Sequence, residues 1–483
     1  MVGPRSLGSV PRVTTYAPTT AATPTGSTLD VHDPATDELL ATLPVADADA
    51  CSAAVDRAGE AAPGWARTSP GDRSGLLKAW ARLLRTHADE LALLQTREGG
   101  KPLADSEGGV GAGIGAIEQY AELGPLHRGR SLQGGWDSTD LMVWQPRGVA
   151  VVLTPWNDPV AIAGQLLAVN LAAGNTVVFK PSERTPLSGI RMVELAHEAG
   201  VPADVLQVVH GAGPTGQALV ADPRVELVCH TGSSLTGREI ARVCAARGAK
   251  AVLELGGKDA CIVDAGVDPV WAAGQVALGA FANTGQVCVS VERVYVVRDV
   301  AQPFLAALVA EAESRRPGPG TDPEATMGPL IDTRQRDLVH AHVEGAVAAG
   351  ATVLTGGQVP PGAGAFYPAT VLIDVPDDAD VMRVETFGPV AAVRVVDDFD
   401  EALTLAADSA YGLAATVLTR DMGHAQRAWR ELPVGTVKVN AAFGGAPGGA
   451  SHPRKGSGQG FGFGPELLDE VSAVTVVHVE PHP

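Results

Sequence analysis

The chain has 483 residues, with 36 basic and 55 acidic side chains and a formal net charge of −19 at pH 7. This acidic excess would repel a phosphate backbone, so nucleic acid is not an expected partner. Hydrophobic residues make up 45% and charged residues 19% of the chain, as in globular proteins with large cores, and the length predicts about three domains or lobes.

The termini and the cysteines bear on the compartment. Residues 1–28, rich in Pro, Thr and Ala, are predicted to form a flexible tail without the apolar core of a signal peptide. No window approaches the roughly 20 apolar residues that a membrane span needs. The cysteines are odd in number and form no CxxC pair: Cys51, Cys229, Cys244, Cys261 and Cys288. We therefore expect a cytoplasmic protein with free thiols, no metal site and no membrane partner.

The first third of the chain is predicted to be mainly helical. Residues 29–48 predict a small β-hairpin, and residues 49–121 repeat apolar side chains at helical spacing. A second helix is expected to run from Arg73 to the Gly99–Gly100 pair. Residues 128–150 are typical of an extended arm or hairpin.

From residue 149 onward, short apolar strands alternate with helical segments. The strands are "VAVVLTP", "NTVVFKP", "LQVVHG", "ELVCHTG" and "AVLELGG", and a second α/β stretch covers residues 267–440. This alternation predicts βαβ units and parallel sheets. Residues 470–480 are predicted to form one terminal strand.

Two loops are candidates for binding phosphate. "GAGPTG", with Gly211, Gly213 and Gly216, matches G-x-G-x-x-G after a strand. "HTGSSLTG" offers the hydroxyl and N–H groups of Thr231, Gly232 and Ser233 at the start of another helix, where a pyrophosphate is attracted. Composition leaves both open, and either loop is equally well explained as a tight turn.

Cys288 ends the turn "NTGQVC", just beyond the apolar run 271–282. Backbone N–H groups in such a turn lower a thiol pKa and hold a developing oxyanion, although a structural cysteine also fits this position taken alone. Other motifs align with it in order: "TPWNDP" with Asn157, "KPSE" at 180–183, "ELGGK" with Glu254, and "ETFGP" at 385–389.

With this ordered set, the chain resembles the NAD(P)-dependent aldehyde dehydrogenase superfamily from about residue 29 to its end. The resemblance implies an α/β fold with a Rossmann-type cofactor domain, an α/β catalytic domain and a small oligomerisation arm. It implies Cys288 as the nucleophile that attacks an aldehyde, Asn157 as an oxyanion donor, and Glu254 as the base that activates water for hydrolysis of the thioester.

The resemblance also implies a cofactor site and favours "HTGSS" as the pyrophosphate loop. Glu183 accepts from a ribose 2′-hydroxyl and repels a 2′-phosphate, so NAD is expected rather than NADP. The residues implied at the cofactor are Trp156, Lys180, Ser182, Glu183, Gly213, Thr231, Gly232, Ser233, Gly256, Glu385 and Phe387.

The expected lobes are discontinuous in sequence. The cofactor domain takes 29–125 and 147–255, the catalytic domain 256–456, and the arm 126–146 and 465–483. An arm with an unpaired edge strand indicates pairing with another subunit, and the resemblance implies a homodimer or homotetramer.

The chain departs from the family pattern near the implied aldehyde pocket. Asp158 stands where an aromatic residue is common, and Leu166 and Gly462 replace a lysine and a glutamate that help the proton leave the general base. The pocket is expected to include Asp158, Ile162, Gln165 and Phe443. As a hypothesis, Asp158 and Gln165 suit a hydroxylated or cationic aldehyde, whereas a solvated Asp158 would leave the substrate unspecified.

Three other functions compete with hydrolytic oxidation. The thioester could pass to coenzyme A, which is disfavoured because Glu254 supplies a base for water. A non-catalytic scaffold would not need Cys288, Asn157 and Glu254 together. A cysteine hydrolase without a cofactor lacks a histidine partner for Cys288.

Overall fold

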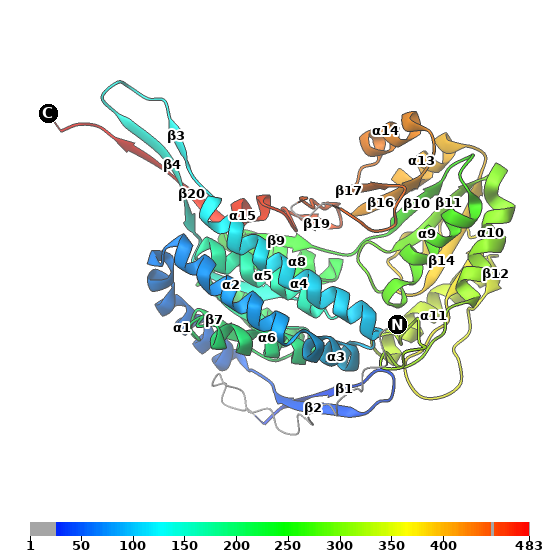
Figure 1. Ribbon diagram of the computed structural model, residues 1–483, viewed down its shortest axis with the longest axis horizontal. Coiled ribbons are helices and arrows are strands. Elements are labelled where there is room, and N and C mark those ends of the chain that lie inside the picture. The colour runs from blue at the N-terminus through cyan, green and yellow to red at the C-terminus, as the bar shows by residue number, and fades with distance from the viewer. Residues whose placement is uncertain (1–25, 446–448, 483) are drawn as a thin grey trace.

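The computed structural model describes residues 26–445 and 449–482 (Figure 1). The predicted hairpin is formed by β1 (Thr28–His32) and β2 (Leu39–Pro44). Four helices follow: α1 (Ala48–Arg67), α2 (Pro70–Thr86), α3 (Ala88–Gly99) and α4 (Leu103–Leu123). The tail predicted for 1–28 lies outside the described residues up to residue 25.

The prediction of one helix from Arg73 to Gly99–Gly100 is wrong, because the chain turns at His87. This residue has φ −103° and ψ 17°, and it caps the end of α2 and the start of α3. Its Nδ1 lies 2.7 Å from Glu90 Oε2 in the first turn of α3. Gly100, with φ 81°, ends α3 in the left-handed conformation typical of a glycine C-cap.

The first large sheet combines five parallel strands with one antiparallel strand, in the order β19-β9-β8-β5-β6-β7. Its parallel strands are β5 (Val149–Leu153), β6 (Thr176–Lys180), β7 (Leu206–Val208), β8 (Val225–Thr231) and β9 (Lys250–Glu254). The connecting helices are α5 (Pro159–Ala173), α6 (Pro186–Glu198), α7 (Gly213–Ala221) and α8 (Ser234–Arg247). The strand order reverses at β5, and α/β sheets bind ligands at the carboxyl edge beside such a reversal.

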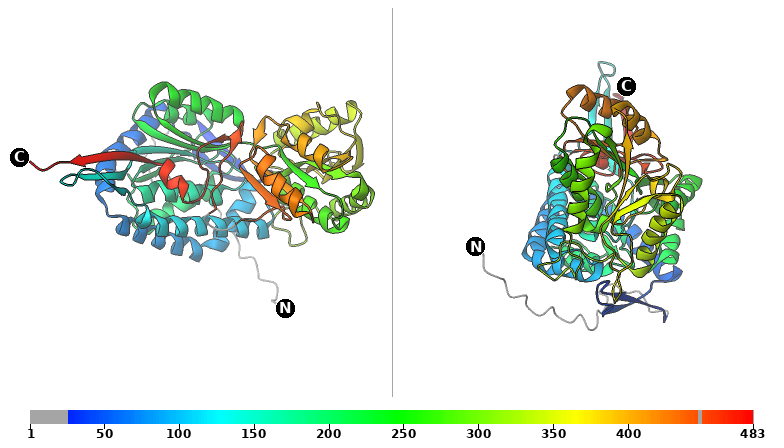
Figure 2. Two further views of the ribbon diagram at one scale, coloured as in Figure 1. Left: turned by 90° about the horizontal axis from the view of Figure 1, so that it is seen from above. Right: turned by 90° about the vertical axis from the view of Figure 1, so that its right-hand side faces the viewer.

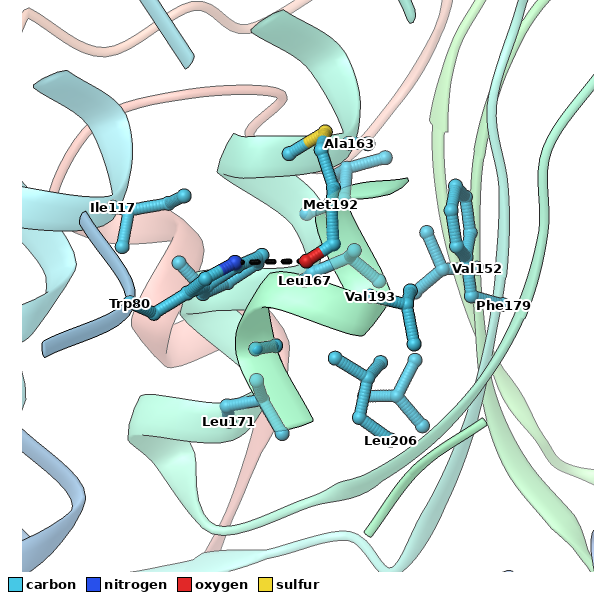
Figure 3. Packing of buried hydrophobic residues seen from close by; sticks show 14 of the residues in the cluster. Trp80, Ile117, Val152, Ala163, Leu167, Leu171, Phe179, Met192, Val193 and Leu206 are labelled. Atoms are coloured by element: carbon cyan, nitrogen blue, oxygen red, sulfur yellow. Dashed lines mark hydrogen bonds between the residues drawn. The ribbon is translucent and has the colours of Figure 1, made fainter. Parts of the chain in front are cut away.

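Helices cover both faces of this sheet. Val152 and Phe179 point to the core beneath α2–α6, whereas Val151 and Val178 point to a second core beneath α1, α7 and α8. Figure 3 shows the first core around Trp80, whose Nε1 donates to Met192 O at 2.9 Å. Burial on both faces explains why these strands are continuously apolar in sequence.

The second large sheet has the order β12-β13-β14-β11-β10-β16-β17, and only β12 is antiparallel. Its strands are β10 (Asp259–Val263), β11 (Val291–Val297), β12 (Thr352–Thr355), β13 (Thr370–Ile373), β14 (Val390–Val396), β16 (Ala414–Leu418) and β17 (Thr436–Val439). The helices around it are α9 (Pro269–Phe281), η2 (Ala282–Gly285), α10 (Arg298–Glu313), α11 (Thr333–Ala348), α12 (Asp380–Arg383), α13 (Phe399–Ala407) and α14 (Met422–Glu431).

A three-stranded antiparallel sheet projects from the body as an arm, as Figures 1 and 2 show. After η1 (Gly124–Leu126), β3 (Arg130–Leu132) pairs with β4 (Thr139–Pro146), and β4 pairs with β20 (Ser472–Val479). Two distant parts of the sequence therefore form one element, and β20 has one edge without a partner strand within the described chain.

Before β20, the chain crosses back over the first large sheet. β18 (Arg454–Lys455) pairs with β15 (Tyr411–Gly412), β19 (Gly458–Gln459) pairs with β9, and α15 (Glu466–Glu470) follows. Gly458 lies opposite Glu254 in this pairing, so the crossing segment covers the strand that ends in the predicted base. The two large sheets divide between Glu254 and Asp259, while the lobe boundaries themselves remain a prediction.

Within the described ranges, no helix combines the length and apolar character needed to cross a bilayer.

Candidate active site

The turn before Cys288 has an uncommon backbone. Asn283 and Thr284 have φ values of 47° and 56°, in the left-handed region that non-glycine residues seldom adopt. Gly285 follows with φ 72°, and a Cβ at this position would lie 2.1 Å from Gly388 O. Such conformations persist where surrounding contacts enforce them, so tertiary contacts must hold this turn.

Side-chain amides supply those contacts. Gln286 Nε2 donates to Asn283 O at 3.0 Å, and the Ile331 N–H donates to Gln286 Oε1 at 2.9 Å. Asn283 Nδ2 donates to Asn157 O and to Gln286 O, both at 3.1 Å. Asn157 Nδ2 in turn donates to Gln286 O at 3.0 Å, which leaves a second N–H on this amide for a ligand. The structure thus brings Asn157 against the turn, as the predicted oxyanion site requires.

Cys288 and Glu254 meet across 34 residues of sequence. Cys288 Sγ donates to Glu254 Oε1 at 3.3 Å, with Glu254 at the end of β9. Desolvation raises the pKa of Glu254, and the bond from the thiol opposes that rise. Desolvation raises the pKa of Cys288 well above its ordinary value, and the Glu254 carboxylate raises it further. Burial therefore favours the neutral thiol, opposite to the pKa lowering predicted from the turn, and this thiol donates its hydrogen bond to Glu254 Oε1.

Access distinguishes Cys288 from the other thiols. Cys51, Cys229, Cys244 and Cys261 are all buried, as expected for packing residues, while Cys288 is partly exposed. A nucleophile needs both access and a proton acceptor. Among the five cysteines, only Cys288 has both.

Most of the predicted cofactor residues lie at the carboxyl ends of β5, β6 and β8. Lys180 Nζ donates to Pro181 O at 2.9 Å and to Gly211 O at 3.0 Å, so it ties down the Gly211–Gly216 loop. Glu183 Oε2 lies 3.7 Å from Lys180 Nζ and its side chain is 40% exposed. Trp156 and Ser182 follow β5 and β6, Thr231 ends β8, and Gly213 is the first residue of α7.

The second candidate phosphate loop is a helix N-terminus. Ser233 is the N-cap of α8, where its Oγ accepts from the Thr236 N–H at 3.3 Å. The preceding Gly232 packs on the His230 ring, because a Cβ there would lie 2.7 Å from a ring carbon. The N-terminus of α8 thus lies just beyond the carboxyl end of β8, and helix N-termini at such a position attract anions.

Glu385 lies against the glycine pair that follows Glu254. Its Oε1 accepts from the Gly257 N–H at 2.9 Å, and a Cβ at Gly256 would lie 2.3 Å from its Oε2. Burial raises the pKa of Glu385 to about 8, and the charge of Glu292 adds to the rise. Only glycine at 256 allows this close approach.

A buried ion pair that the sequence analysis missed supports the Glu385–Phe387 segment. Lys258 Nζ bonds to Glu292 Oε2 with 1% and 4% of the side chains exposed. Glu292 accepts from the backbone N–H groups of Thr386 at 2.8 Å and Phe387 at 2.9 Å. Phe387, at φ 52°, then meets the Trp156 ring edge-on, with 5.3 Å between centroids. The signals in the sequence were the lysine of the "ELGGK" motif and one glutamate inside the apolar strand Val291–Val297.

The predicted pocket residues Gln165 and Asp158 both have partners within the protein. Gln165 Nε2 donates to Gly462 O, and a Cβ at Gly462 would lie 3.4 Å from Glu254 Oε2. Asp158 Oδ1 is 3.3 Å from Lys101 Nζ, a partner that the sequence analysis did not identify.

Three other positions that the sequence analysis named are Ile162 and Phe443, predicted for the pocket, and Leu166, which replaces the family's lysine. Ile162 packs partly buried against the core of the first sheet, and Leu166 is 3% exposed within that core. Phe443 follows β17 and lies under Lys438, with 5.4 Å from Nζ to the ring centroid. In the described residues, no cluster of three or more His, Cys, Asp or Glu side chains is arranged to hold a metal ion.

Comparison with known proteins shows which family the chain resembles. The family model described as "Aldehyde dehydrogenase family" matches residues 21–477. Succinate-semialdehyde dehydrogenase [NADP(+)] of Escherichia coli is 37% identical over 420 residues, covering 86% of this chain and 87% of that protein. Betaine aldehyde dehydrogenase of Cereibacter sphaeroides is 38% identical over 419 residues, 86% of each. An NAD+ complex of an aldehyde dehydrogenase from Bacillus cereus superimposes with a TM-score of 0.92 at 33% identity, over 94% of both chains. The chain therefore belongs to the aldehyde dehydrogenase family.

Proposed function

We propose that this protein oxidises an aldehyde to a carboxylic acid with NAD, through a thioester on Cys288 that water hydrolyses. The observation that carries the proposal is the 3.3 Å contact between Cys288 Sγ and Glu254 Oε1, with the Asn157 amide fastened to the same turn. This arrangement supplies a nucleophile, a proton acceptor and an oxyanion donor in one place.

In the first step the thiol attacks the aldehyde carbon. The S–H proton passes to Glu254, the C–S bond forms, and the carbonyl π electrons move to oxygen. The free N–H of Asn157 and the backbone N–H of Cys288 hold that oxyanion. Removal of one such donor typically lowers turnover by about 100- to 1,000-fold.

The residues at the carboxyl edge fit a dinucleotide. The N-terminus of α8 at Ser233 would bind the pyrophosphate, and Lys180 and Glu183 would bind the adenosine ribose. Glu385, which packs against Gly256, would bind the nicotinamide ribose. NAD, when bound, accepts the hydride that turns the thiohemiacetal into a thioester. The partly exposed Glu183 carboxylate disfavours a 2′-phosphate, so NAD is proposed over NADP. Glu183→Ser should therefore improve kcat/KM for NADP relative to NAD by about tenfold, a change of roughly 1.4 kcal/mol.

Glu254 first releases to solvent the proton that it took from Cys288. In the second step it takes a proton from water, which attacks the thioester carbon and breaks the C–S bond. The acid leaves and Cys288 recovers its proton. With Leu166 buried and Gly462 lacking a side chain, the space beside Glu254 Oε2 is left for the attacking water rather than for a second titratable group. Glu254→Gln should slow the first NADH as well as turnover, because both steps pass a proton to this side chain, and NADH formation should stop at about one per protein because the thioester persists.

The proposed substrate is a small polar aldehyde. The two relatives act on aldehydes of opposite charge by their names, since succinate semialdehyde carries a carboxylate and betaine aldehyde a quaternary ammonium. Asp158 and Gln165 give the pocket a polar wall, and Lys101 balances the charge of Asp158. This balance favours a hydroxylated aldehyde over a cationic one. If Asp158→Phe left the ranking of aldehydes unchanged, this part of the proposal would be wrong.

The proposed assembly is a homodimer or homotetramer built through the arm. Among the described residues, one edge of β20 has no partner strand, and Val474 and Val476 of this strand are 41% and 65% exposed. Unpaired strand edges with apolar side chains pair readily with a second chain. Light scattering on the wild type and on Val476→Asp should give an oligomer and a smaller species, respectively; a monomeric wild type would refute the assembly.

The deciding experiment is absorbance at 340 nm with NAD or NADP and a panel of aliphatic, aromatic, amino- and hydroxy-aldehydes. NADH formation without coenzyme A, abolished in Cys288→Ala, supports the proposal and ranks the substrates. NADH formation that requires coenzyme A would replace hydrolysis by acyl transfer. Silence under both conditions would overturn oxidation of the tested aldehydes.

A further inference from the structure

Helix α4 packs unusually close to α5, and its N-terminus lies beside the catalytic turn. A Cβ at Gly113 would lie 2.5 Å from Val160 O, and one at Gly164 would lie 2.7 Å from Gly113 O. A Cβ at Gly109 would lie 2.4 Å from Asp158 Oδ1. Glycine at these positions lets the two helices approach, and this approach brings the start of α4 to the start of α5.

Lys101, just before α4, is the cation at this junction. Its side chain is 7% exposed, and its Nζ lies 3.3 Å from Asp158 Oδ1, whose side chain is 31% exposed. Asp158 is the N-cap residue of α5 but makes no side-chain capping bond, so Lys101 is its charged partner. A buried ammonium is retained only where carboxylates compensate its desolvation.

A second carboxylate faces the same lysine. Partial desolvation raises the pKa of Asp105. Lys101, a hydrogen bond from the Asn283 backbone N–H and, more weakly, Arg315 oppose that rise. The charge of Asp158 raises the pKa of Asp105 further, because the two carboxylates repel each other. Lys101 attracts both of them.

Each carboxylate is attached to one half of the oxyanion site. Asp158 is the neighbour of Asn157 in sequence, and Asp105 receives the N–H of Asn283. Asn283 Nδ2 donates to Asn157 O at 3.1 Å and so joins the two halves. Lys101 therefore reaches Asn157 in two ways. One is the ion pair with Asp158, the next residue in sequence. The other runs through Asp105 and Asn283, whose side chain donates a hydrogen bond to Asn157 O.

We propose that Lys101 is a positioning residue for the oxyanion site: its ammonium pairs with Asp158 and attracts Asp105, and thereby fixes Asn157 and the Asn283 turn relative to Cys288. This inference rests on the proposed function, because the site it positions is the one that would hold the thiohemiacetal oxyanion.

The physical consequence is electrostatic as well as geometric. Without Lys101, Asp158 loses its ion-pair partner and Asp105 keeps only Arg315 and the Asn283 N–H, beside the place where the substrate oxygen becomes negative. Repulsion disfavours that charge, and the start of α5 with its Asn157 amide is free to shift. A displacement of about 1 Å at such a site costs about 100-fold in rate.

The test compares Lys101→Met, Lys101→Arg, Asp158→Asn and the double variant Lys101→Met/Asp158→Asn, with Lys78→Met at an exposed position of α2 as the control. Two rates are measured per titratable Cys288 thiol. One is aldehyde-dependent NADH formation. The other is cleavage of 4-nitrophenyl acetate without cofactor, which needs the thiol, its proton acceptor and the oxyanion site but no hydride transfer. Thermal unfolding and the KM for NAD accompany both.

We expect Lys101→Met to lower both rates by about 10- to 100-fold with an unchanged KM for NAD. Lys101→Arg should stay within about threefold of the wild type. Both rates of the double variant should be at least tenfold higher than those of Lys101→Met, because the double variant has no unpaired Asp158 charge. Lys78→Met should match the wild type.

Rates for Lys101→Met equal to those of an active wild type would overturn the inference. A loss that Asp158→Asn fails to relieve, or a fall in unfolding temperature with unchanged rates per thiol, would also overturn it in favour of a purely structural role. A wild type that cleaves the ester but forms no NADH with any aldehyde would overturn the proposed function instead, and the ester rates would still test Lys101.

Discussion

Replacement of Lys258 by methionine tests how the Glu385–Phe387 segment is held. Lys258 and Glu292 are almost fully buried, and Glu292 also binds the backbone N–H groups of Thr386 and Phe387. Removal of one member of a buried ion pair leaves the other charge uncompensated and costs about 3–5 kcal/mol. Lys258→Met should therefore destabilise the protein by about 4 kcal/mol.

The expected change in unfolding temperature follows from chain length. If all 483 residues unfold together, the unfolding entropy is about 1 kcal/mol per kelvin and Tm falls by about 4 °C. If the lobe predicted for 256–456 unfolds by itself, its roughly 200 residues give about 0.4 kcal/mol per kelvin, and its transition falls by about 10 °C. Differential scanning calorimetry distinguishes these cases.

Two companion variants make the measurement specific. Arg298→Met breaks the exposed pair with Asp397, where the side chains are 66% and 74% exposed, and should cost less than about 1 kcal/mol. Lys258→Met/Glu292→Gln removes the unpaired charge but keeps an acceptor for the backbone, so it should regain more than about 1 kcal/mol. A Lys258→Met transition no lower than that of Arg298→Met would refute the reasoning.

Two further predictions concern the catalytic turn and the pH range. At Gly285, φ is 72° and an added Cβ would lie only 2.1 Å from Gly388 O. Gly285→Ala should therefore lower the free energy of unfolding by at least about 1–2 kcal/mol and kcat/KM by about tenfold or more. A variant with wild-type activity and Tm would mean that the turn relaxes freely. Burial lowers the pKa of both His210 and His230 from 6.5 to about 4. For His210, the nearby charge of Lys180 adds to this effect. Both rings are neutral in the folded protein, so the stability they contribute is complete above pH 6.5 and is lost as pH falls toward 4. Each should account for about 2 kcal/mol of loss between pH 7.5 and 5, which His230→Phe or His210→Phe would remove and calorimetry at the two pH values would measure.

Local patterns in the sequence determined the elements and the reactive residue types. Continuous apolar strands between helical segments predicted the parallel sheets, because a strand buried on both faces has no polar side. The ordered motifs carried the resemblance to the family, and through it they predicted the roles of Cys288, Glu254 and Asn157. One helix was predicted where two exist, since nothing local except the helix-compatible His87 marks the break.

The tertiary structure decided which side chains share a charge or a hydrogen bond. Lys101 and Asp158 are 57 residues apart, and Lys258 and Glu292 are 34 apart, so no periodicity relates either pair. The Asn283 turn adopts its left-handed backbone only because Gln286, Ile331 and Asn157 close around it. A sequence records which groups can ionise or donate, but the desolvation and distance that fix their pKa values and partners arise only when the two sheets and α4 pack together.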